Sequence, residues 1–145
     1  SEGARLASDI KAKRQYIESL VNVIEQKAES TTAEYQKRLY AKLSAVVAEL
    51  GVKVNEDRIL TECAVFADKV AIDEELVRLR SHFVAFDNYL ESSVPVGRDL
   101  DFSMQGINRE KNTIGSKAQN TEVAHTVVAI KGELEKIREQ IQNIE

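Results

Sequence analysis

Apolar side chains recur at alternating steps of three and four residues along most of the chain, and this spacing restricts the fold more than any other feature. The clearest run lies at the C-terminal end and contains Val123, Val127, Ile130, Leu134, Ile137, Ile141 and Ile144. Such spacing puts the apolar groups on one side of an α-helix, as in helices that pack side by side. Because the chain also has a single Pro and 6% aromatic residues, we predict an all-α fold of long amphipathic helices with coiled-coil-like packing.

The N-terminal third of the sequence reads as helix with one point of ambiguity. Residues 2–28 have the spacing of one long amphipathic helix. Hydroxyl residues at 30–32 then leave two alternatives open. They are either a bend within a continuous helix, or the start of a second helix whose first turn is a capping box made by Thr31 and Glu34.

Turn residues divide the remainder of the chain. Gly51 is expected to end the first helical region, and residues 92–97 carry the strongest turn signal of the sequence. We therefore expect residues 1–50 to form a long helical arm or a helical hairpin. Residues 51–145 are expected to form a helical bundle.

Composition and charge limit the class of protein. At 145 residues with 43% hydrophobic content, the chain can fill the core of one domain or of one compact part of a larger protein. It starts with Ser1 and not Met, which is expected of an internal fragment or a processed chain. The net charge of −4 gives no general attraction to nucleic acid, so binding would need a local basic patch or a metal. No apolar run approaches the roughly 20 residues of a membrane span and no signal-like segment is seen, so we expect a cytoplasmic protein with no membrane partner.

Residues 97–120 have helical spacing but line one side with polar groups. On a helical wheel, four of them fall within about 60° of Asp101: Gln105, Asn108, Asn112 and Ser116. Amides, a hydroxyl and a carboxylate on one face suit a polar partner. They suit a buried hydrogen-bond network between helices equally well. The sequence leaves these two interpretations even.

A second group of chemically active residues lies upstream. Glu75, Arg78 and His82 are spaced three and four apart, so they share one flank of a helix. If Glu62 on the preceding helix faces them, two carboxylates and an imidazole could hold a divalent cation or transfer a proton. The simpler interpretation is an ordinary helix ion pair beside a histidine at the edge of the core.

Two long motifs resemble a known family. The downstream motif has the form GR-x-LDF-x-x-Q-x-x-NRE-x-NT-x-x-SK and is followed by EKIREQIQNIE at the C-terminus; the upstream one is ECAVFADKVAIDEELVRLRSH. Together they cover about residues 61–145 and resemble the C-terminal region of the YicC-like endoribonuclease family. The resemblance implies a bacterial cytoplasmic enzyme that cleaves single-stranded RNA internally. It further implies a ring-like or clamp-like homo-oligomer such as a hexamer, links to stress responses and other RNA-decay proteins, and an N-terminal domain that is absent here.

The resemblance also assigns expected roles by matching position. Catalytic candidates are Glu62, Glu75, His82 and Glu110. Candidates for RNA binding are Arg78, Arg98, Asp101, Gln105, Asn108, Arg109, Asn112 and Lys117. A divalent cation, Mg²⁺ or Mn²⁺, would be held by Glu62, Glu75 and His82.

Three positions depart from the family pattern. Gly106 stands where an acid is usual, Lys111 where a small residue is usual, and Ala71 where an acid precedes EEL. If the acid at position 106 is catalytic in the family, this chain is expected to be a weakened member.

We carry three functional hypotheses forward. In the first, the chain is the C-terminal helical region of an endoribonuclease, in which metal-activated water or a base such as Glu75 or His82 promotes cleavage while Arg98 or Arg109 stabilises phosphate charge. In the second, it is a non-catalytic module for oligomerisation and RNA positioning. In the third, it is an adaptor for another ribonuclease.

Overall fold

The computed structural model describes residues 2–92 and 97–143, and all regular structure in these ranges is helical. The helices are α1 (Glu2–Leu50), α2 (Glu56–Val70), α3 (Asp73–Leu90), α4 (Gly97–Lys117) and α5 (Thr121–Ile141). The all-α prediction is confirmed. None of the helices in the described ranges is long and apolar enough to cross a membrane.

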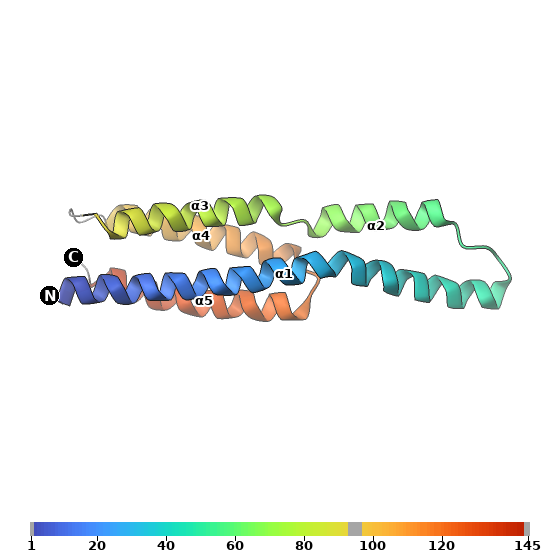
Figure 1. Ribbon diagram of the computed structural model, residues 1–145, viewed down its shortest axis with the longest axis horizontal. Coiled ribbons are helices and arrows are strands. Elements are labelled where there is room, and N and C mark those ends of the chain that lie inside the picture. The colour runs from blue at the N-terminus through green and yellow to red at the C-terminus, as the bar shows by residue number, and fades with distance from the viewer. Residues whose placement is uncertain (1, 93–96, 144–145) are drawn as a thin grey trace.

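The ambiguity at residues 28–34 is resolved in favour of one continuous helix, because α1 runs without interruption over 49 residues. Thr31 is buried and does not form a capping box; its hydroxyl donates a hydrogen bond to the carbonyl of Lys27, one turn earlier, at 2.8 Å. Hydroxyl groups bonded in this way are compatible with a helix and tend to bend it. Figure 1 shows α1 changing direction in its middle part. The helix ends at Gly51, whose positive φ of 69° suits glycine at this position.

Four helical segments form a bundle in which neighbours are antiparallel. The first half of α1 packs against α5 and α3, and α4 packs against α3 and α5, so α1 and α4 lie diagonally across the core (Figure 1). The apolar positions predicted on α5 pack into this core, apart from Ile144, which lies outside the described residues, and apolar side chains of α1, α3 and α4 complete it. Its largest fully buried side chains include Ile10, Ile17, Ile24, Leu79, Phe83, Phe86, Leu100, Ile107, Ile114, Ile130 and Ile137. As a consequence, α4 has α3 on one flank, α5 on the other and solvent in front.

The rest of the molecule is a thin two-helix extension, which we define as residues 32–70. The second half of α1 pairs there with α2, and α2 lies end to end with α3 along the same side of the molecule (Figure 1). Tyr35 and Phe66 stack with ring centroids 3.8 Å apart, and Ile59 and Cys63 are buried between the two helices. Asn55 caps the N-terminus of α2, because its side chain accepts a hydrogen bond from the backbone N–H of Arg58. The region expected as an arm is therefore bundle in its first half and extension in its second.

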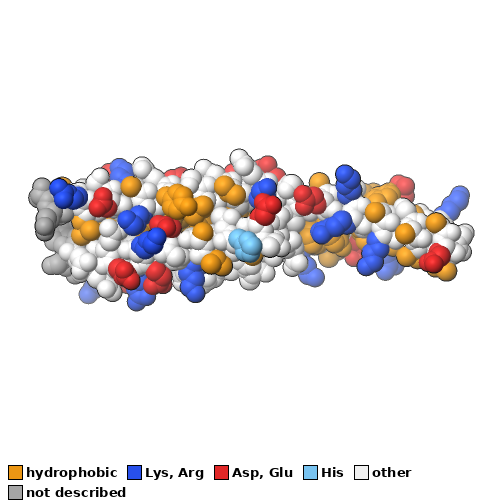
Figure 2. Space-filling model, turned by 90° about the horizontal axis from the view of Figure 1, so that it is seen from below, with side chains coloured by type: hydrophobic (Ala, Val, Ile, Leu, Met, Phe, Trp, Pro, Cys, Tyr) orange, Lys and Arg blue, Asp and Glu red, His pale blue; other side chains and the backbone are white. Residues whose placement is uncertain are grey.

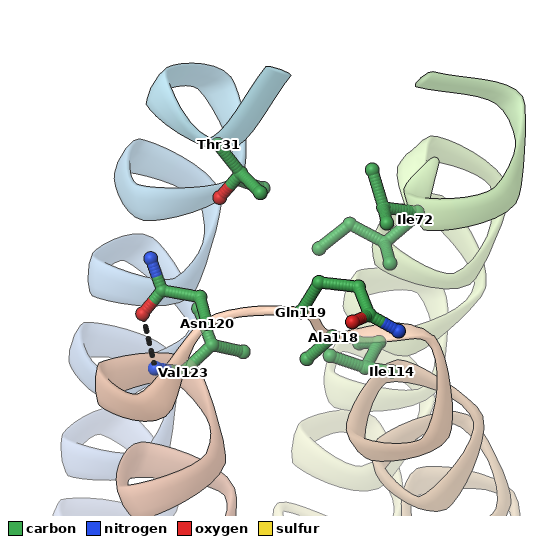
Figure 3. A pocket seen from close by; sticks show the side chains of 9 residues that line it. Thr31, Ile72, Ile114, Ala118, Gln119, Asn120 and Val123 are labelled. Atoms are coloured by element: carbon green, nitrogen blue, oxygen red, sulfur yellow. Dashed lines mark hydrogen bonds between the residues drawn. The ribbon is translucent and has the colours of Figure 1, made fainter. Parts of the chain in front are cut away.

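A small cavity lies at the end of the bundle, where the extension begins. It lies between α1, the start of α3 and the turn from α4 to α5, with Thr31, Ile72 and Ile114 among its lining residues (Figure 3). Asn120 caps α5 at this point by accepting hydrogen bonds from the N–H groups of Glu122 and Val123. This cap fixes the direction in which the chain returns along α4.

Candidate nucleic-acid interface

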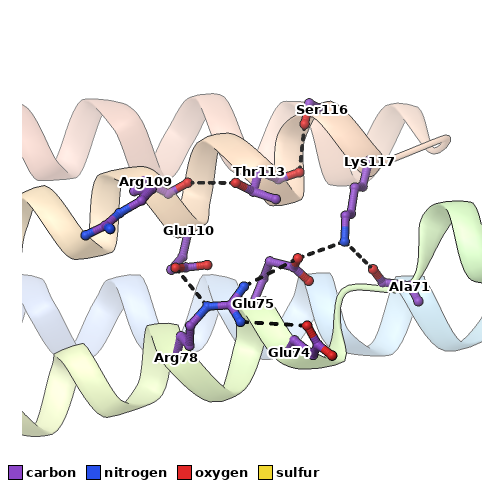
Figure 4. Close-up of polar contacts among 9 residues, drawn as sticks. All are labelled: Ala71, Glu74, Glu75, Arg78, Arg109, Glu110, Thr113, Ser116 and Lys117. Carbon is purple, nitrogen blue, oxygen red and sulfur yellow. Dashed lines mark hydrogen bonds and ion pairs between the residues drawn. The ribbon is translucent and has the colours of Figure 1, made fainter.

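Two buried carboxylates and two cations tie α3 to α4 in what we call the seam network: Glu75, Arg78, Glu110 and Lys117. Nζ of Lys117 donates to Oε1 of Glu75 at 2.8 Å and to the carbonyl of Ala71 at 3.2 Å. Nε of Arg78 donates to Oε1 of Glu110 at 3.0 Å (Figure 4). The carboxylates have side chains only 5% and 7% exposed, whereas Arg78 is 48% exposed. The seam network therefore keeps its acids inside and presents one guanidinium to solvent.

The charges of the seam network act on Glu75. Burial by itself would raise the pKa of the Glu75 carboxyl, but the hydrogen bond from Lys117 and the charges of Lys117 and Arg78 outweigh burial and lower the pKa. The carboxylate is therefore ionised at neutral pH. Because Oε1 already accepts from Lys117 and Oε2 is buried without a partner, Glu75 is better placed to hold cations than to exchange a proton with a substrate.

His82 packs against α4 at Gly106. A Cβ atom added at Gly106 would lie 2.5 Å from Cε1 and 2.6 Å from Nε2 of His82, far inside normal contact distance. The imidazole thus fills the place that a side chain at position 106 would occupy. An acidic side chain at position 106 would require His82 to move. The glycine that stands where the family resemblance leads us to expect an acid therefore makes room for the His82 ring.

The outward side of α4 is polar and exposed, and we call it the α4 face. Its members are Arg98, Asp101, Gln105, Asn108, Arg109, Asn112 and Ser116. The buried-network interpretation of this stretch is wrong, since all seven are exposed. The amide of Gln105 donates to Asp101 at 3.4 Å, and Ser116 bonds to the backbone of its own helix. Most of the hydrogen-bonding capacity of the α4 face is therefore directed to solvent.

A groove runs between α4 and α5 beside this face. Asp101, Gln105 and Asn108 line it from α4, and Glu135 and Arg138 line it from α5. The groove continues to Arg98 at the start of α4.

Lys111 lies close to this groove and is 4% exposed. Within the described residues its amine donates to the neutral Oδ1 of Asn108 at 2.8 Å. Burial, followed by the nearby charge of Lys131, lowers the pKa of the Lys111 amine, and Glu135 opposes the shift. Since Oδ1 of Asn108 faces Lys111, the NH₂ of the same amide is available on the other side.

The structure separates Glu62 from its expected partners. Because α2 and α3 follow one another end to end, Glu62 is exposed on the extension, about 20 Å along the helix direction from Glu75. Within residues 2–92 and 97–143, no group of three or more His, Cys, Asp or Glu is placed to hold a metal ion. The set Glu62, Glu75 and His82 is not brought together, and we derive no step through a metal. The divalent cation stays a prediction without a ligand set in the described chain.

Two exposed residues of this surface are absent from the sequence-based candidates. Phe102 is 65% exposed on α4, and Arg138 reaches the groove from α5. Phe102 could have been found, because it belongs to the LDF part of the downstream motif and falls next to Arg109 on the helical wheel. Arg138 could not, because its approach to Asp101 depends on how α5 is placed.

Fold and site together define an all-α module that presents one polar, arginine-containing helix face to solvent. The chain belongs to the YicC-like endoribonuclease family, since the family model described as "Endoribonuclease YicC-like, C-terminal" matches residues 24–145. It is 40% identical over 144 residues to the "Probable endoribonuclease YicC" of Clostridioides difficile (strain 630), with 99% of this chain and 49% of that protein covered. The protein of the same name from Haemophilus influenzae is 33% identical over 139 residues, with 88% and 48% covered. The chain spans about half the length of these curated relatives.

Proposed function

We propose that this chain is the helical part of an endoribonuclease that holds single-stranded RNA on the α4 face and beside His82. One observation carries the proposal. Residues of the two family motifs, more than 20 positions apart in sequence, meet where α3 and α4 pack, and most of those on α4 are exposed. The names of the relatives, which are called probable endoribonucleases, support RNA as the polymer that this surface meets.

The chemistry of the α4 face suits unpaired RNA. Arginines bind phosphate through paired N–H donors, and side-chain amides can both donate to and accept from base edges. Base edges are accessible to such groups mainly in single strands, because the major groove of an RNA duplex is too deep and narrow to read. Arg98 and Arg109 would position the backbone, while Gln105, Asn108 and Asn112 would contact bases or 2′-hydroxyls.

For cleavage, we assign proton transfer to His82. Its half-buried ring lies beside exposed Arg78 and has no hydrogen-bond partner among the described residues. An imidazole can take or give a proton near neutral pH, and an adjacent guanidinium can stabilise a phosphorane-like transition state. Glu75 and Glu110 act in this scheme as positioning residues, since each holds a cation in place.

The test is cleavage of a fluorescent single-stranded RNA by the complete gene product and by the 145-residue chain, with and without chelator. We expect His82→Ala to lower kcat at least a hundredfold while RNA affinity changes less than threefold. Lys136→Met is the matched control, because Lys136 is exposed and pairs with Glu133 on its own helix. Wild-type cleavage by His82→Ala would remove the assignment. Cleavage that stops in chelator would restore a metal to the mechanism.

A second proposal concerns self-association, and it rests on the extension. A two-helix layer cannot bury both faces of its helices, and Leu50, Val52, Leu60 and Val65 are each more than half exposed there. Figure 2 shows Lys and Arg side chains interspersed with apolar ones on one face of the extension. We propose that a second copy of the chain covers these residues in a homo-oligomer.

Light scattering would measure the mass of the wild type and of a Leu60→Glu, Val65→Glu variant. We expect the variant to have a lower mass at unchanged helicity. An equal mass for both proteins would exclude the extension as the contact. The adaptor hypothesis would gain if neither protein cleaved RNA but both captured a ribonuclease.

A further inference from the structure

Phe102 is an exposed aromatic ring at the edge of the polar α4 face. Its 65% exposed fraction contrasts with the other large apolar residues of α4, since Leu100, Met104, Ile107 and Ile114 are all buried. A phenylalanine left in water forgoes the favourable free energy of burying its ring. The ring is therefore available to a ligand and is not part of the core.

The neighbours of Phe102 on the helix are charged or small. Arg98 lies one turn before it, Gln105 and Gly106 one turn after it, and Arg109 two turns after it. Arg98 and Arg109 are exposed, and their Cα atoms are roughly 16 Å apart along the helix. An aromatic ring between two arginines is the arrangement that binds an unpaired base and the phosphates on either side of it.

Gly106 keeps the neighbourhood of the ring open. Side chains on a helix lean toward its N-terminus, so a residue at position 106 would extend toward Phe102. Glycine has no side chain, and the space is occupied by the imidazole of His82, which comes from α3. Phe102 therefore lies one helical turn before the position on α4 against which His82 packs.

We infer that Phe102 is a stacking site for one unpaired nucleobase of single-stranded RNA, with Arg98 and Arg109 holding the neighbouring phosphates. This inference rests on the proposed RNA binding and adds to it a residue and a mode of contact. A protein partner is less well matched, because the exposed neighbours of Phe102 on the described part of α4 are polar or charged and include Arg98, Asp99 and Arg109. The stacked base would lie about one helical turn along α4 from the position against which His82 packs, the residue to which we assign proton transfer.

Substitutions at Phe102 separate stacking from simple apolar contact. Affinity would be measured for a 12-nucleotide oligouridylate and for a ribose-phosphate 12-mer without bases, using wild type, Phe102→Trp, Phe102→Leu and Phe102→Ala. We expect Phe102→Leu and Phe102→Ala to weaken oligouridylate binding roughly 5- to 150-fold, and Phe102→Trp to keep it. Binding of the base-free oligomer should be the same for all four proteins. The slope of log affinity against log salt should also stay constant, because no charge is removed.

Two control variants sharpen the result. Val77→Ala removes an equally exposed apolar side chain from α3 and should bind both oligomers as wild type does. Arg109→Gln should weaken both oligomers and lower the salt slope, since it removes a phosphate contact.

Several outcomes would overturn the stacking site. Phe102→Leu binding oligouridylate as tightly as wild type would exclude it, and so would an equal loss on the base-free oligomer. A lower mass of Phe102→Leu in light scattering, with unchanged RNA affinity, would assign the ring to a contact between copies. If the wild type binds neither oligomer at any salt concentration, the proposed RNA binding itself fails, and this inference fails with it.

Discussion

The two flanks of α4 treat charge in opposite ways. Toward α3, every charged group of the seam network has an opposite charge within 4 Å. Toward α5, buried Lys111 has a neutral amide as its partner, and the neighbouring groove is lined by Arg138, Glu135 and Asp101. A network of paired charges fixes the α3–α4 geometry, whereas polar groups that face solvent are available to a ligand. We call the α3 side of α4, with the seam network and His82, the frame. From this contrast we expect the frame to hold the helices in place, and the α4 face and the groove to bind the ligand.

The largest effect on stability is expected at Gly106, where the His82 ring lies against α4. Gly106→Ala should lower the free energy of unfolding by about 2 kcal/mol, because its Cβ overlaps the His82 ring. In a His82→Ala background the same substitution should raise stability by up to about 1 kcal/mol, through better helix propensity. Urea unfolding of the four proteins of this double-mutant cycle measures the difference. An equal effect of Gly106→Ala in both backgrounds would show that the two residues do not interact.

The next effect concerns the buried acid of the frame. Lys117→Met should cost about 2 kcal/mol, because it leaves Glu75 charged and buried with Arg78 3.6 Å away. The value lies below that for a fully buried pair, since Lys117 is about one third exposed. Lys136→Met, which breaks a more exposed pair on α5, should change stability by less than about 0.5 kcal/mol. Equal losses would mean that burial of the acid has no consequence.

The Glu75–Lys117 pair also predicts how the stability of the protein decreases at low pH. The pKa of Glu75 is lowered in the folded protein, so its stabilising contribution is present above the unfolded pKa and is lost as pH falls through the folded pKa. Lys117→Met removes the main cause of that lowering. Its stability should therefore fall less than that of wild type as pH drops below the unfolded pKa of Glu75, in urea titrations between pH 7 and 3. Parallel curves would assign the loss of stability at low pH to other carboxylates.

The frame and the binding face differ in how far the sequence could predict them. The core positions of α3 and α5 followed from spacing, because each helix needs one apolar stripe. The exposure of Asp101 to Ser116 could not be decided, since a polar stripe looks the same against water and against another helix. Glu62 could meet Glu75 only if α2 and α3 lay side by side, and the short connection at Ala71 and Ile72 instead lets the two helices run end to end. The spacing of residues in the sequence specifies which side chains share one face of a helix. Which helix faces then pack together depends on the direction that the chain takes after each turn.

Lys111 tests the opposite flank. Replacing it with Met should raise stability by about 1 kcal/mol at pH 7, because a buried cation without a carboxylate partner is removed. The folded pKa of Lys111 lies below its ordinary value of 10.5, so the unfolded chain binds the proton more tightly and wild-type stability rises as pH rises through that interval. The advantage of Lys111→Met should therefore shrink toward pH 10.5. An advantage that does not change with pH would point to packing and not to charge.

The smallest effect should be found on the binding face itself, where substitutions leave the fold intact. Arg109→Gln should not change the melting temperature, because the Arg109 side chain is exposed. The hydrogen bond that Thr113 donates goes to the backbone carbonyl of Arg109, so the substitution does not remove it. It should weaken binding of single-stranded RNA a few-fold and reduce the salt slope by about 0.7, the value for one phosphate contact on a single strand. Arg78→Gln provides the contrast, since Arg78 also belongs to the frame: it should lower both affinity and melting temperature. If Arg109→Gln lowered the melting temperature as much as Arg78→Gln does, the division of α4 into a frame side and a binding side would be wrong.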